Sequence, residues 1–314
     1  MKKFILFSAV ILLSFVAVLS SCSSEEDVVT KSDTITLQQS NTFQQLQLIN
    51  DSVCQANAAR TSRINWLRSL YLVSADAIGA YEMGKIGGTV GSLAGPTGTI
   101  VGGAVGGLIG GIGMSWGAYE SSKGCAGLSG FLTLQDMINA YKGMCSVTPR
   151  PEEDYTLAMP DNLEDIGKLH NMTMDYLMVG ENTVMPLGNE LEKPVGPGVS
   201  ETPVLSELEL RVLESEEYGV AYNSSMEVLS DGVTIPTVMS DGSLKDEIMI
   251  MYMDAIGSYS SNDCYNEIVN LTNEYLQIVR ASDELSDDDK DQLSIAFAVA
   301  VYSYQYWSTH DIEN

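Results

Sequence analysis

The stretch "IVGGAVGGLIGGIG", residues 100–113, decides the fold of this chain. Pairs of bulky apolar residues alternate in it with pairs of glycines, and residues 86–113 hold 12 glycines in 28 positions. Each glycine inside a helix costs about 1 kcal/mol relative to alanine, so a helix with this many must be stabilised by something else. Small residues at every fourth position form a flat groove along which a second helix can lie in van der Waals contact. The stretch therefore predicts one arm of a closely packed helical hairpin.

The predicted hairpin covers about residues 77–120 and has its packing seam on the glycine face of both arms. The "GPTG" sequence at 95–98 predicts the turn between the arms. Bulky pairs such as Leu108 and Ile109 fall on the opposite face of the second arm. The expected seam residues are Gly87, Gly91, Gly95, Gly98, Gly102, Gly106 and Gly110, and Gly103, Gly107 and Gly111 repeat the same spacing in a second row.

The charge pattern bears on whether this hairpin crosses a membrane. Residues 86–119 carry no charge, and the second arm, 99–118, reaches the length of about 20 residues that a span requires. The first arm contains Glu82 and Lys85, which leaves too few uncharged residues before the turn for a second span. We therefore expect a hairpin buried among flanking helices, and insertion into a target membrane is the alternative.

The N-terminus has the three parts of a secretion signal. Lys2 and Lys3 precede an apolar core, and small residues follow up to Cys22, so residues 1–21 are expected to be removed. The "LSSC" sequence that ends at Cys22 resembles a bacterial lipobox. In that family the signal is cut before the cysteine, which then carries the lipid. The resemblance implies that Cys22 is lipidated and that a membrane is a partner of the protein.

The next segment, residues 22–40, is polar and acidic, and its composition predicts a flexible tether. Its acidic run at 25–27 resembles the export signal on surface lipoproteins of Bacteroidota-type bacteria. That resemblance implies an outer-membrane location, with the periplasmic and the cell-surface leaflet as alternatives. The sequences "DTI" and "DSV" resemble the short O-glycosylation site of the same bacteria and make Thr34 and Ser52 candidate sites.

Four cysteines besides Cys22 remain after the signal is removed. They are Cys54, Cys125, Cys145 and Cys264. An even number of cysteines in an exported chain predicts two disulfides, with the pairing undetermined and buried thiols as the alternative. No C-x-x-C pair is present, so we expect no metal site.

Composition and the remaining motifs argue against several function classes. The chain has 42 acidic and 16 basic residues, a net charge of −26, which disfavours binding to nucleic acid. Its only histidines are His170 and His310, and no HExxH motif accompanies them. His170 is predicted on the polar side of an amphipathic helix, in a surface or capping role. We expect neither an enzyme nor a cofactor.

The whole pattern predicts an all-α protein, a helical bundle around the central glycine-rich hairpin. The expected parts are an N-terminal helical region, 41–148, and a C-terminal helical region, 149–314, with a proline-rich loop at 183–204. The hairpin resembles the glycine-zipper hairpins of bacterial outer-membrane lipoproteins and the GxxxG segments of two-peptide bacteriocins. The first likeness implies a structural or binding lipoprotein with an unidentified protein partner. The second implies a membrane-active protein.

Overall fold

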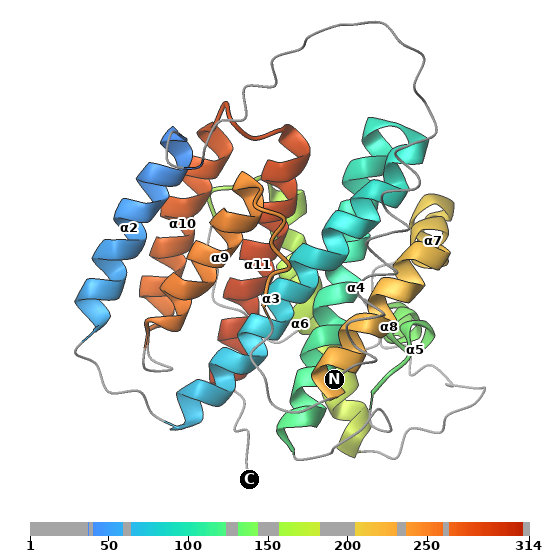
Figure 1. Ribbon diagram of the computed structural model, residues 1–314. Helices are drawn as coiled ribbons and strands as arrows, with labels where there is room; N and C mark the ends of the chain where they lie inside the picture. The colour runs from blue at the N-terminus through green and yellow to red at the C-terminus, as the bar shows by residue number, and fades with distance from the viewer. Residues whose placement is uncertain are drawn as a thin grey trace, which may run out of the picture. The chain divides into compact units, whose positions relative to one another are not determined.

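A computed structural model describes residues 37, 40–58, 64–123, 131–143, 157–182, 205–230, 237–259 and 264–309. The chain divides into Met1–Thr36 and a unit formed by Leu37–Asn314, and only the second is described below. Every regular element in the described ranges is a helix (Figure 1). The prediction of an all-α bundle is therefore confirmed. The signal peptide and most of the tether lie outside the described residues.

The described unit contains ten α-helices and one short 3-10 turn, η2. Their bounds are α2 Asn41–Asn57, α3 Ile64–Gly91, η2 Ser92–Ala94, α4 Pro96–Ser122, α5 Leu134–Gly143, α6 Asp161–Asn182, α7 Glu207–Leu213, α8 Glu216–Ser230, α9 Leu244–Gly257, α10 Tyr265–Ala281 and α11 Asp287–Thr309.

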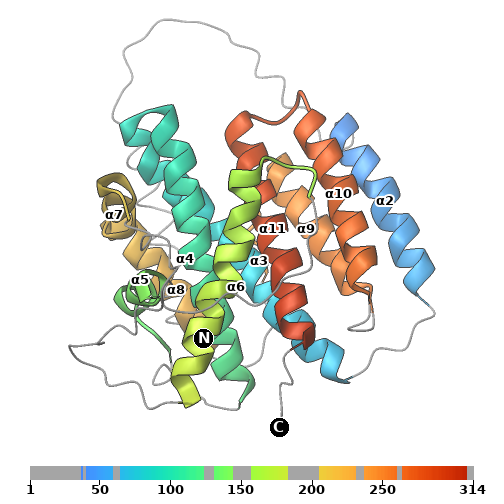
Figure 2. The ribbon, with the colours of Figure 1, turned by 180° about the vertical axis from the view of Figure 1, so that it is seen from behind.

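The helices assemble around the pair formed by α3 and α4, which makes the most extensive helix–helix contact of the unit. Helix α11 lies against both arms, and α6 and α8 also contact α4 (Figures 1 and 2). Helices of the regions 41–148 and 149–314 are thus packed together in one unit.

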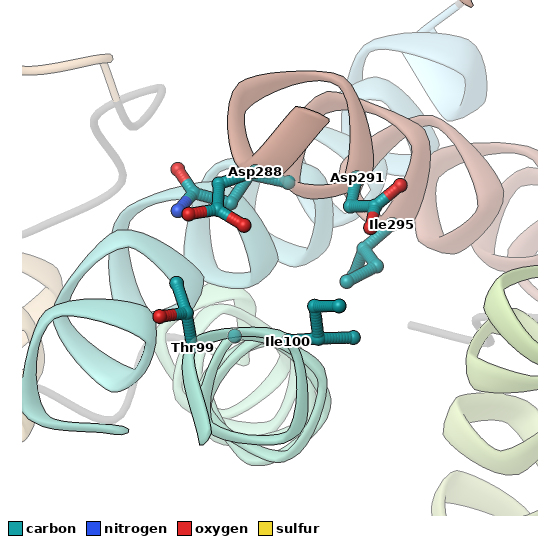
Figure 3. A pocket seen from close by; sticks show the side chains of 7 residues that line it. Thr99, Ile100, Asp288, Asp291 and Ile295 are labelled. Atoms are coloured by element: carbon teal, nitrogen blue, oxygen red, sulfur yellow. The ribbon is translucent and has the colours of Figure 1, made fainter. Parts of the chain in front are cut away.

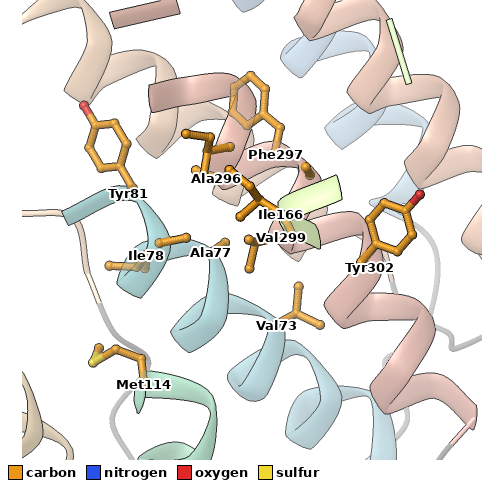
Figure 4. Close-up of a cluster of buried hydrophobic side chains, with 14 of the residues drawn as sticks. Val73, Ala77, Ile78, Tyr81, Met114, Ile166, Ala296, Phe297, Val299 and Tyr302 are labelled. Carbon is orange, nitrogen blue, oxygen red and sulfur yellow. The ribbon is translucent and has the colours of Figure 1, made fainter. Parts of the chain in front are cut away.

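The core between α3, α6 and α11 is filled by side chains of different sizes. Figure 4 shows Val73 and Ala77 of α3 facing Ile166 of α6 and Val299 of α11, and all four are buried. A stripe of large side chains along α11 is also buried, as are two of the three methionines in residues 249–253. The stripe comprises Phe297, Val301, Tyr304 and Trp307, each at most 1% exposed, and the two buried methionines are Met249 and Met251.

Hydrogen bonds at the starts of α11 and α2 show at which end of the unit α2 begins. Helix α11 begins after Ser286, whose hydroxyl accepts from the Asp289 amide at 3.1 Å and so caps the helix. Helix α2 begins after Ser40, whose hydroxyl donates to Glu284 in the α10–α11 loop at 2.7 Å. The start of α2 and the start of α11 therefore lie at the same end of the unit (Figure 1).

Candidate functional site

The seam between α3 and α4 brings the two backbones into direct contact. A Cβ atom on Gly91 would overlap the carbonyl oxygen of Gly98, and one on Gly98 would overlap that of Gly91. Gly87 and Gly102 exclude each other's Cβ in the same way. Only glycine permits this approach, because any side chain would push the helices apart.

The seam continues beyond the glycines that the sequence pattern identified. A Cβ on Gly106 would lie 2.7 Å from the Met83 carbonyl oxygen, so Met83 takes the position opposite Gly106. One turn further, a Cβ on Gly79 would lie 2.6 Å from the Gly110 carbonyl oxygen. Gly79 was missed by the sequence analysis, although it lies two turns before Gly87 on the same face.

Gly95 was expected in the seam, and this expectation is wrong. Its φ is +86°, and no atom lies within 4 Å of the position a Cβ would occupy. It is the residue before α4, where the left-handed backbone conformation reverses the chain and Pro96 starts the next helix. The turn itself is formed by Ser92–Gly95 and Pro96, close to the predicted "GPTG".

The second row of glycines contacts two partners at once. A Cβ on Gly107 would lie 3.0 Å from the Ala80 carbonyl oxygen and 3.0 Å from Ile295 Cγ2 of α11. Gly111 is placed similarly, against Asp76 and Val299. This row therefore accommodates α3 and α11 together.

Tyrosines of α8 cover a further side of α4. The Tyr218 hydroxyl donates to the Gly106 carbonyl oxygen at 2.8 Å, and a Cβ on Gly113 would lie 2.5 Å from the Tyr222 ring. Glycines on α4 thus contact aromatic rings as well as helix backbones.

Within the described residues, α4 is the one helix long and apolar enough to cross a bilayer by length and composition. An apolar window of 18 residues within α4 meets these criteria, and 72% of this window is buried inside the protein. Core helices of globular proteins meet the same criteria, so this observation is weak evidence for membrane association.

The tip of the hairpin differs from its buried length. Leu93 in η2 is 92% exposed, and Ile100 in the first turns of α4 is 41% exposed. Next to the tip, a shallow pocket is lined by Thr99, Ile100, Gly103, Asp288, Asp291, Gln292 and Ile295 (Figure 3). The hairpin tip therefore adjoins the acidic start of α11.

The two charges of the first arm are neutralised by neighbours. Lys85 Nζ lies 3.1 Å from Glu82 and 3.0 Å from Asp246 of α9, and the Tyr81 hydroxyl donates to Asp246 at 2.6 Å. Burial raises the pKa of Glu82. Although burial alone would lower it, the neighbouring carboxylates raise the pKa of Lys85 above its ordinary value. This cluster ties the hairpin to α9.

A second polar cluster is fully buried between α3, α6 and α11. Asp76 Oδ2 accepts from Ser303 Oγ and from Trp307 Nε1, the latter at 3.1 Å, and His170 Nε2 lies 3.6 Å from the same oxygen. Burial raises the pKa of Asp76, and His170, Ser303 and Trp307 oppose that shift. The order of groups does not match a Ser–His–Asp triad, in which histidine lies between the other two.

The surface position predicted for His170 is wrong, because its side chain is 0% exposed. Its ring Nδ1 lies 3.2 Å from Asn171 Oδ1. Helical spacing alone placed it on the polar side of α6, but α3 and α11 cover that side with polar partners. Sequence analysis missed Asp76, Ser303 and Trp307 as a cluster because they come from distant parts of the chain.

The remaining candidate residues are described only in part. Cys54 keeps a half-buried thiol on α2 and Cys264 a buried one, and no disulfide joins cysteines of the described ranges. The expected disulfides are therefore not supported for Cys54 and Cys264. Ser52 is exposed on α2. The candidates that lie outside the described residues are Cys22, Thr34, Cys125, Cys145 and His310.

Among the described residues, no group of three or more His, Cys, Asp or Glu side chains is arranged to hold a metal ion. Comparisons with family models, with curated proteins and with solved structures find no match to this chain. Its most distinctive feature is the glycine-seamed hairpin, with a buried length and an exposed apolar tip.

Proposed function

We propose that this protein is a non-enzymatic lipoprotein, anchored to the outer membrane or cell surface through lipid on Cys22, in which the hairpin is a packed scaffold. The observation that carries the scaffold role is the burial of α4, whose apolar window is 72% inside the protein. The "LSSC" sequence supports the anchor.

The contacts of α4 on several sides support a permanent scaffold. Its glycines contact α3 through backbone atoms, α11 through Ile295 and Val299, and α8 through Tyr218 and Tyr222. Insertion of the hairpin would break all these contacts and leave the facing surfaces of α8 and α11 uncovered. Exposing those apolar surfaces to water would cost about 25 cal/mol for each Å² uncovered, and this cost opposes insertion.

A membrane-active protein is the second candidate. The observation that favours it is α4 itself, which has the length and composition of a span. In this alternative, contact with a target bilayer would release the hairpin from the bundle.

Labelling with a fatty acid tests the anchor. The wild-type chain should incorporate the label and fractionate with membranes, and Cys22→Ser should do neither. Cys54→Ser, which removes a half-buried thiol from α2, is the matched control and should be labelled like wild type. A labelled Cys22→Ser protein, or an unlabelled wild type, would contradict the anchor.

Leakage of dye from liposomes separates the two candidates. The scaffold requires no leakage at any protein concentration at which the bundle remains folded. Leakage by the Cys22→Ser protein would favour the membrane-active alternative.

A further inference from the structure

The hairpin tip is an uncharged surface around Leu93, with no covering element in the described part of the chain. Its exposed residues are Ser92–Ala94, Pro96 and Thr97, with Ile100 one turn further along α4, and Leu93 is 92% exposed. No charged residue occurs between Lys85 and Glu120. A leucine exposed to this extent at the end of a long uncharged hairpin contributes nothing to the core.

The same end of the unit carries the start of the described chain. The hydroxyl of Ser40 and the amides of Asn41 and Thr42 all donate to the Glu284 carboxylate in the α10–α11 loop. A few residues later, Asp288 and Gln292 of α11 line the pocket beside Thr99 and Ile100. Figures 1 and 2 show the start of α2, the α10–α11 loop and the hairpin tip at one end.

The chain that precedes Ser40 connects this end to Cys22. Residues 22–39 are 18 residues and span at most about 60 Å even when fully extended. Lipid on Cys22 would keep the start of α2 within that distance of the bilayer surface, and the tip lies at the same end of the unit. Such tethering raises the local concentration of the tip at the membrane, so a contact too weak to recruit the protein by itself can still form.

We propose that the hairpin tip inserts Leu93 and its apolar neighbours shallowly into the bilayer that holds the lipid on Cys22, while the seam and the rest of α4 stay in the bundle. This inference rests on the proposed lipid anchor. It adds a second membrane contact to that anchor, and together the two would fix the orientation of the unit on the membrane.

The charges beside the tip define the kind of bilayer. Asp283, Glu284, Asp287 and Asp288 lie in the α10–α11 loop and the first turn of α11, where they would face the headgroups. They repel an anionic surface, so the contact must come from apolar insertion. The tip therefore fits a zwitterionic bilayer and should bind less well when anionic lipid is added.

A tryptophan placed at the tip tests the contact. The lipidated full chain carrying Leu93→Trp is reconstituted on vesicles of phosphatidylcholine, with and without bromine on the acyl chains. The control is Val228→Trp, which replaces a residue 60% exposed on α8. Its neighbour Leu229 accepts from Ser121 at the far end of α4, so the control lies away from the tip. Both replaced side chains are exposed, so both variants should fold like wild type.

After subtraction of the wild-type signal from its three tryptophans, brominated lipid should quench the added emission several-fold more in Leu93→Trp than in Val228→Trp. Replacing half of the phosphatidylcholine with phosphatidylglycerol should reduce that quenching. Equal quenching in the two variants would overturn the inference. So would an emission shift of Leu93→Trp that depends on protein concentration without vesicles, because a second copy would then cover the tip.

Flotation of the same samples tests the lipid anchor separately from the tip contact. Protein that does not float with the vesicles contradicts the anchor. Protein that floats without selective quenching of Leu93→Trp leaves the anchor intact and refutes the tip contact.

Discussion

Two helical hairpins of unlike construction meet in this unit. In α3–α4 the backbones touch, and the residues at the contact have almost no side chain. In α10–α11 the contact is made by side chains, such as the rings of Tyr275 and Phe297, whose centroids are 5.9 Å apart. Helix α11 also packs on both arms of α3–α4, so the second hairpin holds the first in place.

The difference shows two ways to stabilise a helix pair. Aromatic and aliphatic side chains bury large areas and fill space, and each loses rotamer entropy on folding. Glycines bury little area and weaken each helix, but they allow the closest approach of two backbones along several turns. The first kind of pair should be sensitive to removal of atoms and the second to their addition.

The two tips differ as well. The turn of α3–α4 exposes Leu93 and carries no charge, whereas the turn of α10–α11 is acidic and uses Glu284 to hold the start of α2. One end of the unit therefore presents an apolar and an acidic surface side by side.

The largest effect is expected from a charge on the bulky face of α4. Leu108 is 3% exposed, so Leu108→Lys would bury an unpaired ammonium group and should lower the free energy of unfolding by at least about 5 kcal/mol, which prevents folding. Circular dichroism and urea unfolding measure this. Ile100→Lys, 41% exposed on the same helix, is the control and should stay within about 1 kcal/mol of wild type. A folded Leu108→Lys protein would favour the membrane-active alternative.

The junction between the hairpins depends on Asp76. Asp76→Ala removes the acceptor of Ser303 Oγ and Trp307 Nε1 and the carboxylate beside His170. Breaking a buried pair in this way should cost about 3–5 kcal/mol in urea unfolding. Asp76→Asn keeps one acceptor and should cost less, about 1–3 kcal/mol. If Asp76→Ala were as stable as wild type, the cluster would contribute nothing to joining α3 with α11.

The seam itself is tested by adding one methyl group. Gly106→Ala places a Cβ 2.7 Å from the Met83 carbonyl oxygen and should destabilise the protein by about 1–3 kcal/mol. Gly219→Ala is the matched change in α8, where no atom lies within 4 Å of the new methyl group. It should stabilise the protein by up to about 1 kcal/mol through helix propensity. Opposite shifts in melting temperature are expected, and a rise for both variants would refute the seam.

The smallest effect concerns the acidic turn and depends on pH. Burial raises the pKa of Glu284, but the hydrogen bonds from Ser40, Asn41 and Thr42 outweigh this and lower the pKa from 4.5 to about 2. Because the folded value is below the unfolded one, this stabilisation is present above pH 4.5 and is lost as the pH falls toward 2. Glu284→Gln should lower the free energy of unfolding by about 1 kcal/mol at pH 7. It should also make that free energy less dependent on pH between 4.5 and about 2.

Asp283→Asn is the control for that experiment, since it removes the same charge from an exposed neighbour in the loop. Its stability should follow the wild-type pH dependence. If Asp283→Asn flattens the curve as much as Glu284→Gln, general charge repulsion rather than the cap on α2 would explain the effect.

Sequence periodicity alone was sufficient for much of this fold. The spacing of glycines and apolar residues predicted an all-α bundle, and the helices of the described ranges confirm it. The four-residue repeat of glycines predicted a hairpin with the turn near residue 95. All of these are properties of consecutive residues, because a helix is formed by contacts between residues three and four apart.

Only the tertiary structure decided what surrounds each of those residues. It removed Gly95 from the seam and added Gly79, because pairing across the turn depends on the position of the second helix. It buried His170 on a side of α6 that its own sequence marks as polar, because Asp76 and Ser303, 227 positions apart, meet there. Periodicity determines which side chains share a face of a helix, but which element covers that face depends on residues distant in sequence.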